Sequence, residues 1–143
     1  MDARKKGNEH VLWLDRGEPV VASLQEYIGR AGIRGGSVVG LGAVEAAELG
    51  TFDPVRRTYD RTTIPGPREL LSLVGTISRL DGRPFVHAHV TLGAPDFSVV
   101  GGHLFEARVA VTGEFVIHEA AIDSSRILDD ATGLKLMRFE GET

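Results

Sequence analysis

Runs of strand-forming residues, each ended by a turn signal, fill most of this sequence and limit its fold more than any other feature. The predicted strands cover residues 10–14, 47–52, 58–64, 70–77, 85–92 and 104–117. The breaks between them include Asp53-Pro54, Pro65-Gly66-Pro67 and Asp81-Gly82, which are typical turn sequences. Because short connections join strands of opposite direction, we expect a mostly antiparallel meander.

A glycine-punctuated apolar run over residues 35–44 lies between the first and second of these strands. It predicts a further strand that another backbone approaches closely, because glycine has no side chain to hold a neighbour away. A phosphate-binding loop is the alternative. The Gly-x-x-x-x-Gly-Lys-Ser/Thr spacing is missing, however, and the glycines lie inside the run.

Residues 20–31 have the periodicity of a helix. The apolar positions at helical spacing are Val20, Leu24, Tyr27, Ile28 and Ala31. Pro19 suits the start of such a helix, and Gly32 suits a left-handed cap at its end. The predicted fold class is therefore α+β, a mostly antiparallel sheet with one main helix packed on it.

The length of 143 residues fits one domain, and 42% hydrophobic with 25% charged residues is an ordinary globular composition. We expect a single domain over residues 10–143, preceded by a flexible polar lead-in over residues 1–9. The tail contains Leu134-Lys135-Leu136-Met137, which predicts a last short strand.

The charge and the missing cysteines restrict the kinds of partner and of metal ligand. The net charge is -4, which argues against a broad surface for phosphate backbones. With no cysteine, any metal must be held by histidine or carboxylate, and a reducing cytoplasm is a compatible location. No segment has the ~20 consecutive apolar residues that span a bilayer, so no membrane partner is expected.

Three histidines are spaced to hold a metal ion. His87 and His89 lie two residues apart in a predicted strand, so their side chains share one face about 6–7 Å apart. His103 follows Gly101-Gly102, where the backbone can come close to another element. Three neutral imidazoles with an open fourth position suit zinc or a similar divalent ion. The alternative is that all three are ordinary residues on a half-exposed face.

Two carboxylates flank this trio in sequence. Asp96 precedes the glycine pair and Glu106 follows it, and either is a candidate accessory group, as a fourth ligand or acting on a bound water. A solvated position in a loop or at a strand edge is the alternative for each. His10 and His118 have no such neighbours, and we expect them to be ordinary surface or core residues.

Several segments, in order, resemble the plants and prokaryotes conserved (PPC) domain family. They are the glycine run 36–44, Leu49-Gly50-Thr51-Phe52-Asp53-Pro54, the strand 69–78, Pro84-Phe85-Val86-His87-Ala88-His89-Val90 and Val99-Val100-Gly101-Gly102-His103-Leu104. The likeness covers residues 11–137 and implies a stand-alone member of the prokaryotic type. It implies a compact α+β domain that assembles as a homotrimer, and it implies the family's label of DNA-binding or regulatory protein.

That DNA-binding label belongs mainly to relatives with a separate AT-hook. The hook reads the minor groove through Arg-Gly-Arg-Pro. This chain has Asp81-Gly82-Arg83-Pro84, with an acidic residue at the first position, in a predicted hairpin turn. The assembly is therefore implied more directly than DNA binding.

Three functions remain open on the sequence. The first is a trimeric binding or regulatory module with a metal held by the histidines. The second is a metal-dependent enzyme acting on a small molecule. The third is DNA binding through a basic edge of Arg56, Arg57, Arg61 and Arg68, although acidic residues are interspersed among these arginines.

Overall fold

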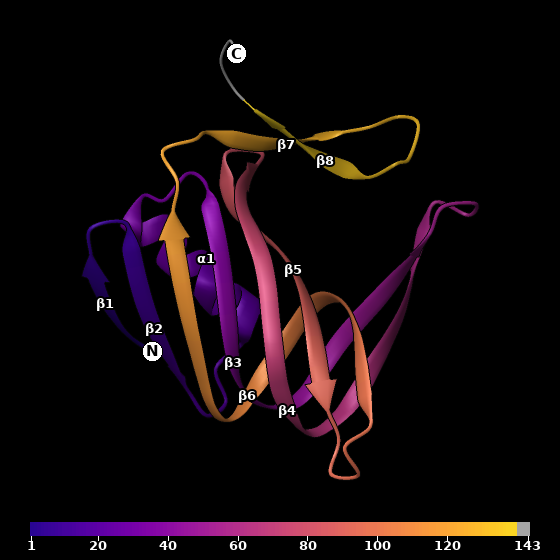
Figure 1. Cartoon of the computed structure of the whole chain (residues 1–143). Helices are drawn as coiled ribbons and strands as arrows, with labels where there is room; N and C mark the ends of the chain where they lie inside the picture. Colours follow the sequence, from indigo (N-terminus) through magenta and orange to yellow (C-terminus); the bar gives the residue numbers. More distant parts are fainter. Residues whose placement is uncertain (140–143) are drawn as a thin grey trace.

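The computed structural model describes residues 1–139 and contains one helix among eight strands (Figure 1). The elements in chain order are β1 (Asp2–Lys6), β2 (Glu9–Asp15), α1 (Val20–Ala31), β3 (Gly36–Asp53), β4 (Thr58–Leu80), β5 (Arg83–Gly93), β6 (Val99–Glu119), β7 (Ser124–Leu128) and β8 (Lys135–Phe139). The mostly antiparallel sheet with one helix confirms the predicted α+β fold class. Among the described residues, only the single bridge between Arg79 of β4 and Ser125 of β7 is parallel.

Four long strands close on themselves. β3 pairs with both β4 and β6, and β5 also pairs with both β4 and β6, so the path β3–β4–β5–β6 returns to its start. β6 joins β5 near its beginning and β2 near its end, which is possible because this strand is 21 residues long. The beginning of β6 is therefore held on both sides.

One predicted strand break is a bend within a longer strand. The runs 58–64 and 70–77 form one strand, β4, that continues through Pro65-Gly66-Pro67. Pro65 still pairs with Ala46 of β3, and a register shift next to this pair absorbs the irregularity. A Cβ atom on Gly66 would lie 2.0 Å from the backbone oxygen of Glu45, so only glycine fits this close approach.

Helix α1 covers one face of the sheet, as its periodicity predicted. Val20, Leu24 and Ile28 are buried and pack in one core with residues from the strands, among them Phe115. Gly32 caps the helix in the left-handed conformation, with φ 71°.

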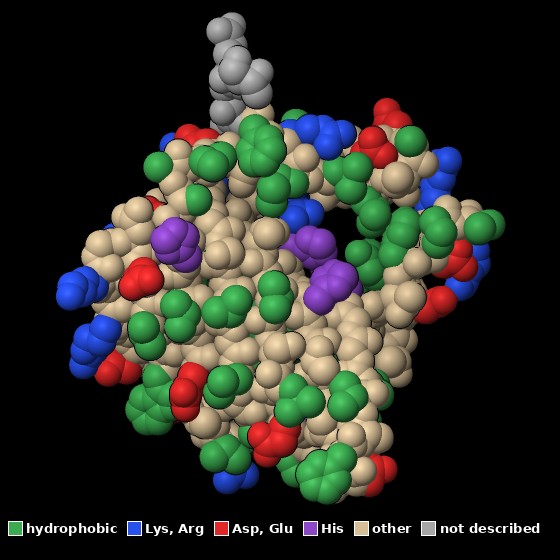
Figure 2. All heavy atoms as spheres, viewed as in Figure 1, with side chains coloured by type: hydrophobic (Ala, Val, Ile, Leu, Met, Phe, Trp, Pro, Cys, Tyr) green, Lys and Arg blue, Asp and Glu red, His purple; other side chains and the backbone are tan. Residues whose placement is uncertain are grey.

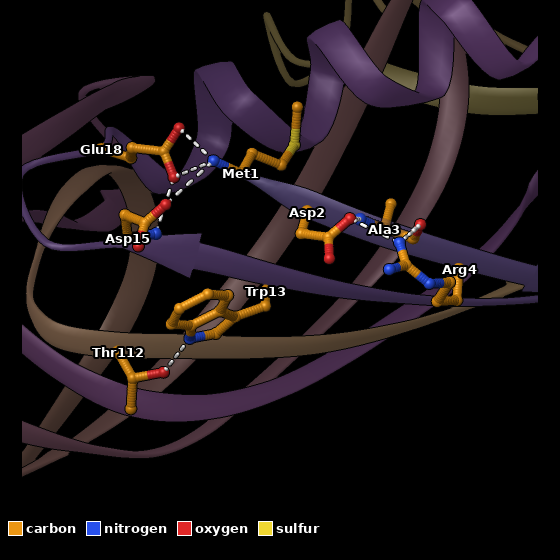
Figure 3. Close-up of polar contacts among 8 residues, drawn as sticks. All are labelled: Met1, Asp2, Ala3, Arg4, Trp13, Asp15, Glu18 and Thr112. Atoms are coloured by element: carbon orange, nitrogen blue, oxygen red, sulfur yellow. Dashed lines mark hydrogen bonds and ion pairs between the residues drawn. The ribbon is translucent and has the colours of Figure 1, made fainter.

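The prediction of a flexible lead-in over residues 1–9 is wrong. Asp2–Lys6 forms β1, which pairs antiparallel with β2. The Met1 amino group lies 2.8 Å from a carboxylate oxygen of Glu18 and 3.3 Å from one of Asp15 (Figure 3). Polar residues form a strand here because an edge strand needs only one partner and exposes its side chains to water.

An exposed apolar row crosses the face of the sheet opposite to the core. Val11 of β2 is opposite Val116 of β6, which is opposite Val39 of β3, and Val39 is in turn opposite Val74 of β4. All four side chains are between 41% and 60% exposed. Figure 2 shows apolar side chains spread over this view of the molecule.

The tail forms a hairpin that lies across one end of the sheet (Figure 1). β8 confirms the predicted short strand around 134–137, and β7, its antiparallel partner, was not predicted. None of the helical residues within 1–139 forms a segment long and apolar enough to cross a bilayer.

Candidate metal centre

Strand β5 presents His87 and His89 on one face. The residues that alternate with them, Val86, Ala88 and Val90, are buried in the core. The alternation of the strand therefore directs both imidazoles away from the core. This confirms the geometry predicted from the two-residue spacing.

The turn between β5 and β6 brings the third imidazole to the other two. His103 is directly opposite His89 across the antiparallel pair, and on its other side it is paired with Gly50 of β3. A Cβ atom on Gly101 would lie 2.7 Å from the backbone oxygen of Val90. The glycine pair before His103 therefore allows the close approach that its sequence predicted.

The three imidazoles converge within a single chain. One ring nitrogen from each residue can be chosen so that all three lie within 4.8 Å of one another, and the ring centroids are 5.0 to 5.6 Å apart. Bonds of about 2.0–2.1 Å to a tetrahedral zinc ion place ligand nitrogens about 3.4 Å apart. Small side-chain rotations bring the trio to that spacing, so its geometry fits such an ion.

One ring nitrogen of His103 lacks a hydrogen-bond partner within residues 1–139. Nδ1 is the one buried side-chain N or O atom within residues 1–139 that has no hydrogen-bond partner. The ring of His103 packs against those of Tyr59 and Phe105, whose centroids are 5.0 and 4.7 Å away. Buried polar atoms normally find a partner, so this orphaned atom is an independent sign of a missing ligand.

The electrostatics favour neutral imidazoles. Burial lowers the pKa of His87 to about 4, and the charges of Arg126 and His89 act in the same direction. Burial likewise lowers the pKa of His103 to about 4, with His87, His89, Arg126 and Arg61 contributing. At neutral pH these two rings are unprotonated, which is the form that binds a metal.

An arginine that the sequence did not single out lies beside the trio. Arg126 of β7 donates to Thr76 Oγ1 at 3.5 Å and to Ser78 Oγ at 3.1 Å, and its guanidinium lies over the ring of Phe85. Thr76 is directly opposite His87 across β4 and β5. No local pattern marks Arg126, because the tail hairpin brings it to β4 from 50 residues away.

The two predicted accessory carboxylates do not join the trio. Asp96 accepts hydrogen bonds from the backbone N–H and the hydroxyl of Ser98, so it shapes the β5–β6 turn. Glu106 accepts hydrogen bonds from the backbone N–H groups of Val21 and Ala22 in the first turn of α1. Within residues 1–139 the only group of three or more potential ligands is the histidine trio.

The other histidines are separate from this site. His10 is buried, and its ring is within hydrogen-bond distance of the Tyr27 hydroxyl at 2.9 Å and of Glu119 at 3.4 Å. His118 is exposed on β6. Both are ordinary core or surface residues in this structure, as expected.

The arginines of the predicted basic edge are largely engaged within the chain. Arg56 pairs with Asp53 at 2.7 Å and Asp60 at 2.5 Å. Arg61 pairs with Glu48 at 3.2 Å, and its guanidinium lies over Phe105. The positive charge at this edge is therefore partly neutralised.

Comparison with protein families gives one match. The family model of the Plants and Prokaryotes Conserved domain, abbreviated PCC or PPC, matches residues 1–121. The match thus includes β1 and the histidine trio but ends before β7, short of the residue 137 that the sequence resemblance suggested. Comparison with curated protein sequences finds no match.

Three solved structures show how similar the chain is to known proteins. A candidate DNA-binding protein from Bacteroides thetaiotaomicron is 31% identical, with a TM-score of 0.93 and 98% of each chain covered. A metal-containing protein from Archaeoglobus fulgidus is 36% identical, with a TM-score of 0.84 over 92% of this chain and 94% of the other. A plant- and prokaryote-conserved protein from Pyrococcus horikoshii is 31% identical, with a TM-score of 0.85 over 96% and 94%.

Proposed function

The chain belongs to the Plants and Prokaryotes Conserved domain family, and on this basis we propose that it is a homotrimeric binding module that holds a divalent metal ion through His87, His89 and His103. The observation that carries the metal part is the convergence of three imidazoles, one of which, His103, has a buried Nδ1 without a hydrogen-bond partner within residues 1–139. The metal-containing relative from Archaeoglobus fulgidus supports it independently.

Zinc is the ion that we propose. Imidazole is a preferred ligand of zinc, and three protein ligands leave one position for water or another molecule. A bound zinc ion would supply Lewis acidity at that open position. The chain's contribution is to hold the three rings on β5 and β6, with His103 packed against Tyr59 and Phe105.

A binding role is better supported than catalysis. No carboxylate within residues 1–139 joins the trio, so the common general base of a hydrolytic metal site is missing from the described part of the chain. The open ligand position favours a metal-dependent enzyme as the second candidate. Zinc-dependent turnover of a chromogenic ester that disappears in His87→Ala would favour the enzyme over the binding module.

The exposed apolar row supports the proposed homotrimer. Val11, Val116, Val39 and Val74 form this continuous row, and soluble monomers seldom leave such a face uncovered. A groove of about 590 Å³ lies on the same molecule, lined in part by Leu71, Val99 and Val111. Phe97 at its edge is 91% exposed, as expected for a residue that packs on another subunit.

The similarity to the candidate DNA-binding protein from Bacteroides thetaiotaomicron favours DNA binding as a further candidate function. The candidate contacts on this chain are Arg56, Arg57, Arg61 and Arg68. Since Arg56 and Arg61 are paired with carboxylates and the net charge is -4, we expect weak, salt-dependent binding. An electrophoretic mobility shift that persists unchanged as salt rises would contradict contact with phosphates.

Elemental analysis tests the metal proposal directly. The protein is purified without an affinity tag, dialysed with zinc and then freed of loosely bound ions. We expect about one zinc per chain in the wild type and in the control variant His118→Ala, and none in His87→Ala/His89→Ala. Equal zinc content in all three proteins would show that the trio does not hold the ion.

A further inference from the structure

The tail hairpin places a positive charge next to the histidine trio. β5 carries Phe85, His87 and His89 at alternate positions, so the three side chains share one face. The guanidinium carbon of Arg126 lies 5.1 Å from the centroid of the Phe85 ring. Arg126 also reaches Thr76, the residue directly opposite His87. The arginine therefore lies on the face that carries the metal ligands.

The charge of Arg126 has no carboxylate partner within residues 1–139. Its side-chain hydrogen bonds go to the hydroxyls of Ser78 and Thr76 and to the backbone oxygen of Lys135, which are all neutral. Arg34 and Arg56 each contact a carboxylate, whereas Arg57 and Arg68, like Arg126, donate to backbone oxygens. A half-buried guanidinium without a counter-ion is costly, so this position favours an anion.

The metal ligands strengthen this preference. Three neutral imidazoles leave the full double charge of a divalent ion uncompensated, and no carboxylate joins them in the described part of the chain. With the ion bound, the site would combine that charge with the charge of Arg126. An anion that bridges the two would neutralise both.

The guanidinium also retains donors for such a ligand. It has five N–H groups, and its bonds to Ser78, Lys135 and Thr76 account for three of them. The remaining donors and the planar shape of the group suit a carboxylate or phosphate, which guanidinium binds through two parallel hydrogen bonds.

We infer that Arg126 makes this site a receptor for a small molecule bearing an oxyanion, a carboxylate or phosphate, which takes the open metal position and pairs with the guanidinium. The inference rests on the proposed metal site and adds the class of its ligand. Arg126 lies beyond residue 121, where the match to the family model ends, so this feature comes from the tail of this chain.

The test uses the full chain loaded with cobalt(II), whose visible spectrum reports both metal binding and exchange of the fourth ligand. Acetate and inorganic phosphate are titrated separately into the wild type, Arg126→Met, Arg126→Lys and the control Arg138→Met. Arg138 belongs to the same hairpin but pairs with Asp129 at 3.9 Å. Circular dichroism checks the fold of every variant, and Arg126→Lys replaces Arg126→Met as the decisive variant should the latter unfold.

We expect one cobalt per chain in all four proteins, and an anion affinity about ten- to a hundredfold lower in Arg126→Met than in the wild type or Arg138→Met. Arg126→Lys keeps the positive charge but loses the two parallel N–H donors of the guanidinium, so we expect an intermediate affinity for the anion. The anion with the larger loss identifies the preferred ligand, carboxylate or phosphate.

Two outcomes overturn the inference separately from the metal proposal. Full cobalt loading with the same anion affinity in the wild type and both Arg126 variants would refute the role of Arg126 and leave the metal site intact. No cobalt in the wild type would refute the metal site, and the bridged anion with it. A duplex oligonucleotide that changes the cobalt spectrum as strongly as free phosphate would show that the ligand is a nucleic acid rather than a small molecule.

Discussion

His89 and His103 are directly opposed across β5 and β6, yet His89 is exposed while Nδ1 of His103 is buried without a hydrogen-bond partner within residues 1–139. This buried Nδ1 without a partner destabilises the folded protein when no metal is bound. We therefore predict that His103→Leu raises the free energy of unfolding by about 1 kcal/mol when metal is absent, because it removes a desolvated polar atom. Urea denaturation in the presence of a chelator measures this.

The matched control for that prediction is His89→Leu. It also removes a metal ligand, but from an exposed position, so it should not stabilise the metal-free protein. Equal stabilisation by both variants would show that general hydrophobicity, and not the orphaned nitrogen, is responsible.

Zinc should stabilise the fold through the trio. An ion that binds only the folded chain adds about 2.7 kcal/mol when its concentration is a hundred times the dissociation constant. We predict a rise in melting temperature with zinc for the wild type and for His118→Ala, and no rise for His87→Ala/His89→Ala. Differential scanning calorimetry at several zinc concentrations measures the shift, and an equal rise in the double variant would refute the assignment.

Acid should destabilise the metal-free protein in a defined pH window. The pKa of His87 and that of His103 are about 4 in the folded chain, below the ordinary value of 6.5. Between these values the unfolded chain binds more protons, so stability is fully present above about pH 6.5 and is lost as the pH falls toward 4. We predict that His103→Leu flattens this dependence and that His118→Gln does not, as measured by chelator-treated urea unfolding across the window.

Gly50 should be required for the packing of Tyr59 and Phe105 against His103. A Cβ atom there would lie 2.6 Å from the Phe105 ring and 3.0 Å from the Tyr59 ring. We predict that Gly50→Ala costs about 1–3 kcal/mol of folding free energy and weakens zinc binding. The cost should be smaller in a Phe105→Leu background, where the ring is gone. Additive effects of the two substitutions in a double-mutant cycle would show that the contact is not the cause.

The exposed apolar row should mediate the proposed trimer. Val74 is 60% exposed in the single chain, and a charge in its place would be buried on assembly. We predict that Val74→Glu shifts the protein from trimer to monomer in light scattering coupled to size-exclusion chromatography. Val55→Glu is the control, because Val55 is 90% exposed in the turn between β3 and β4, away from the row. A wild type that is monomeric at micromolar concentration would contradict the proposal.

The sequence predicted the local parts of the site because they follow from strand geometry. The two-residue spacing of His87 and His89 is sufficient to place both on one face of β5. The position of His103 follows from the turn, since the paired residues of β5 and β6 are symmetric about Asp96. Asp96 lies at the centre of the turn that sets this pairing. It is therefore close to the histidines in sequence but lies outside their cluster in space.

The parts that sequence reasoning missed depend on contacts between distant segments. Arg126 reaches the site only because the β7–β8 hairpin crosses the end of β4, where the ladder between β4 and β7 has a single bridge. Tyr59 reaches it because β3 and β4 pair over almost their whole lengths, past the bend at Gly66. β1 was missed because its polar residues carry no core pattern, and its order comes from pairing with β2.

The closed path of β3, β4, β5 and β6 has a consequence for the thermodynamics of metal capture. His103 is hydrogen-bonded into the sheet between Gly50 and His89, so its backbone has no freedom left to lose when an ion arrives. The conformational entropy of bringing three ligands together is spent during folding. Capture of the ion then requires only rotation of side chains, which makes this a preorganised chelator.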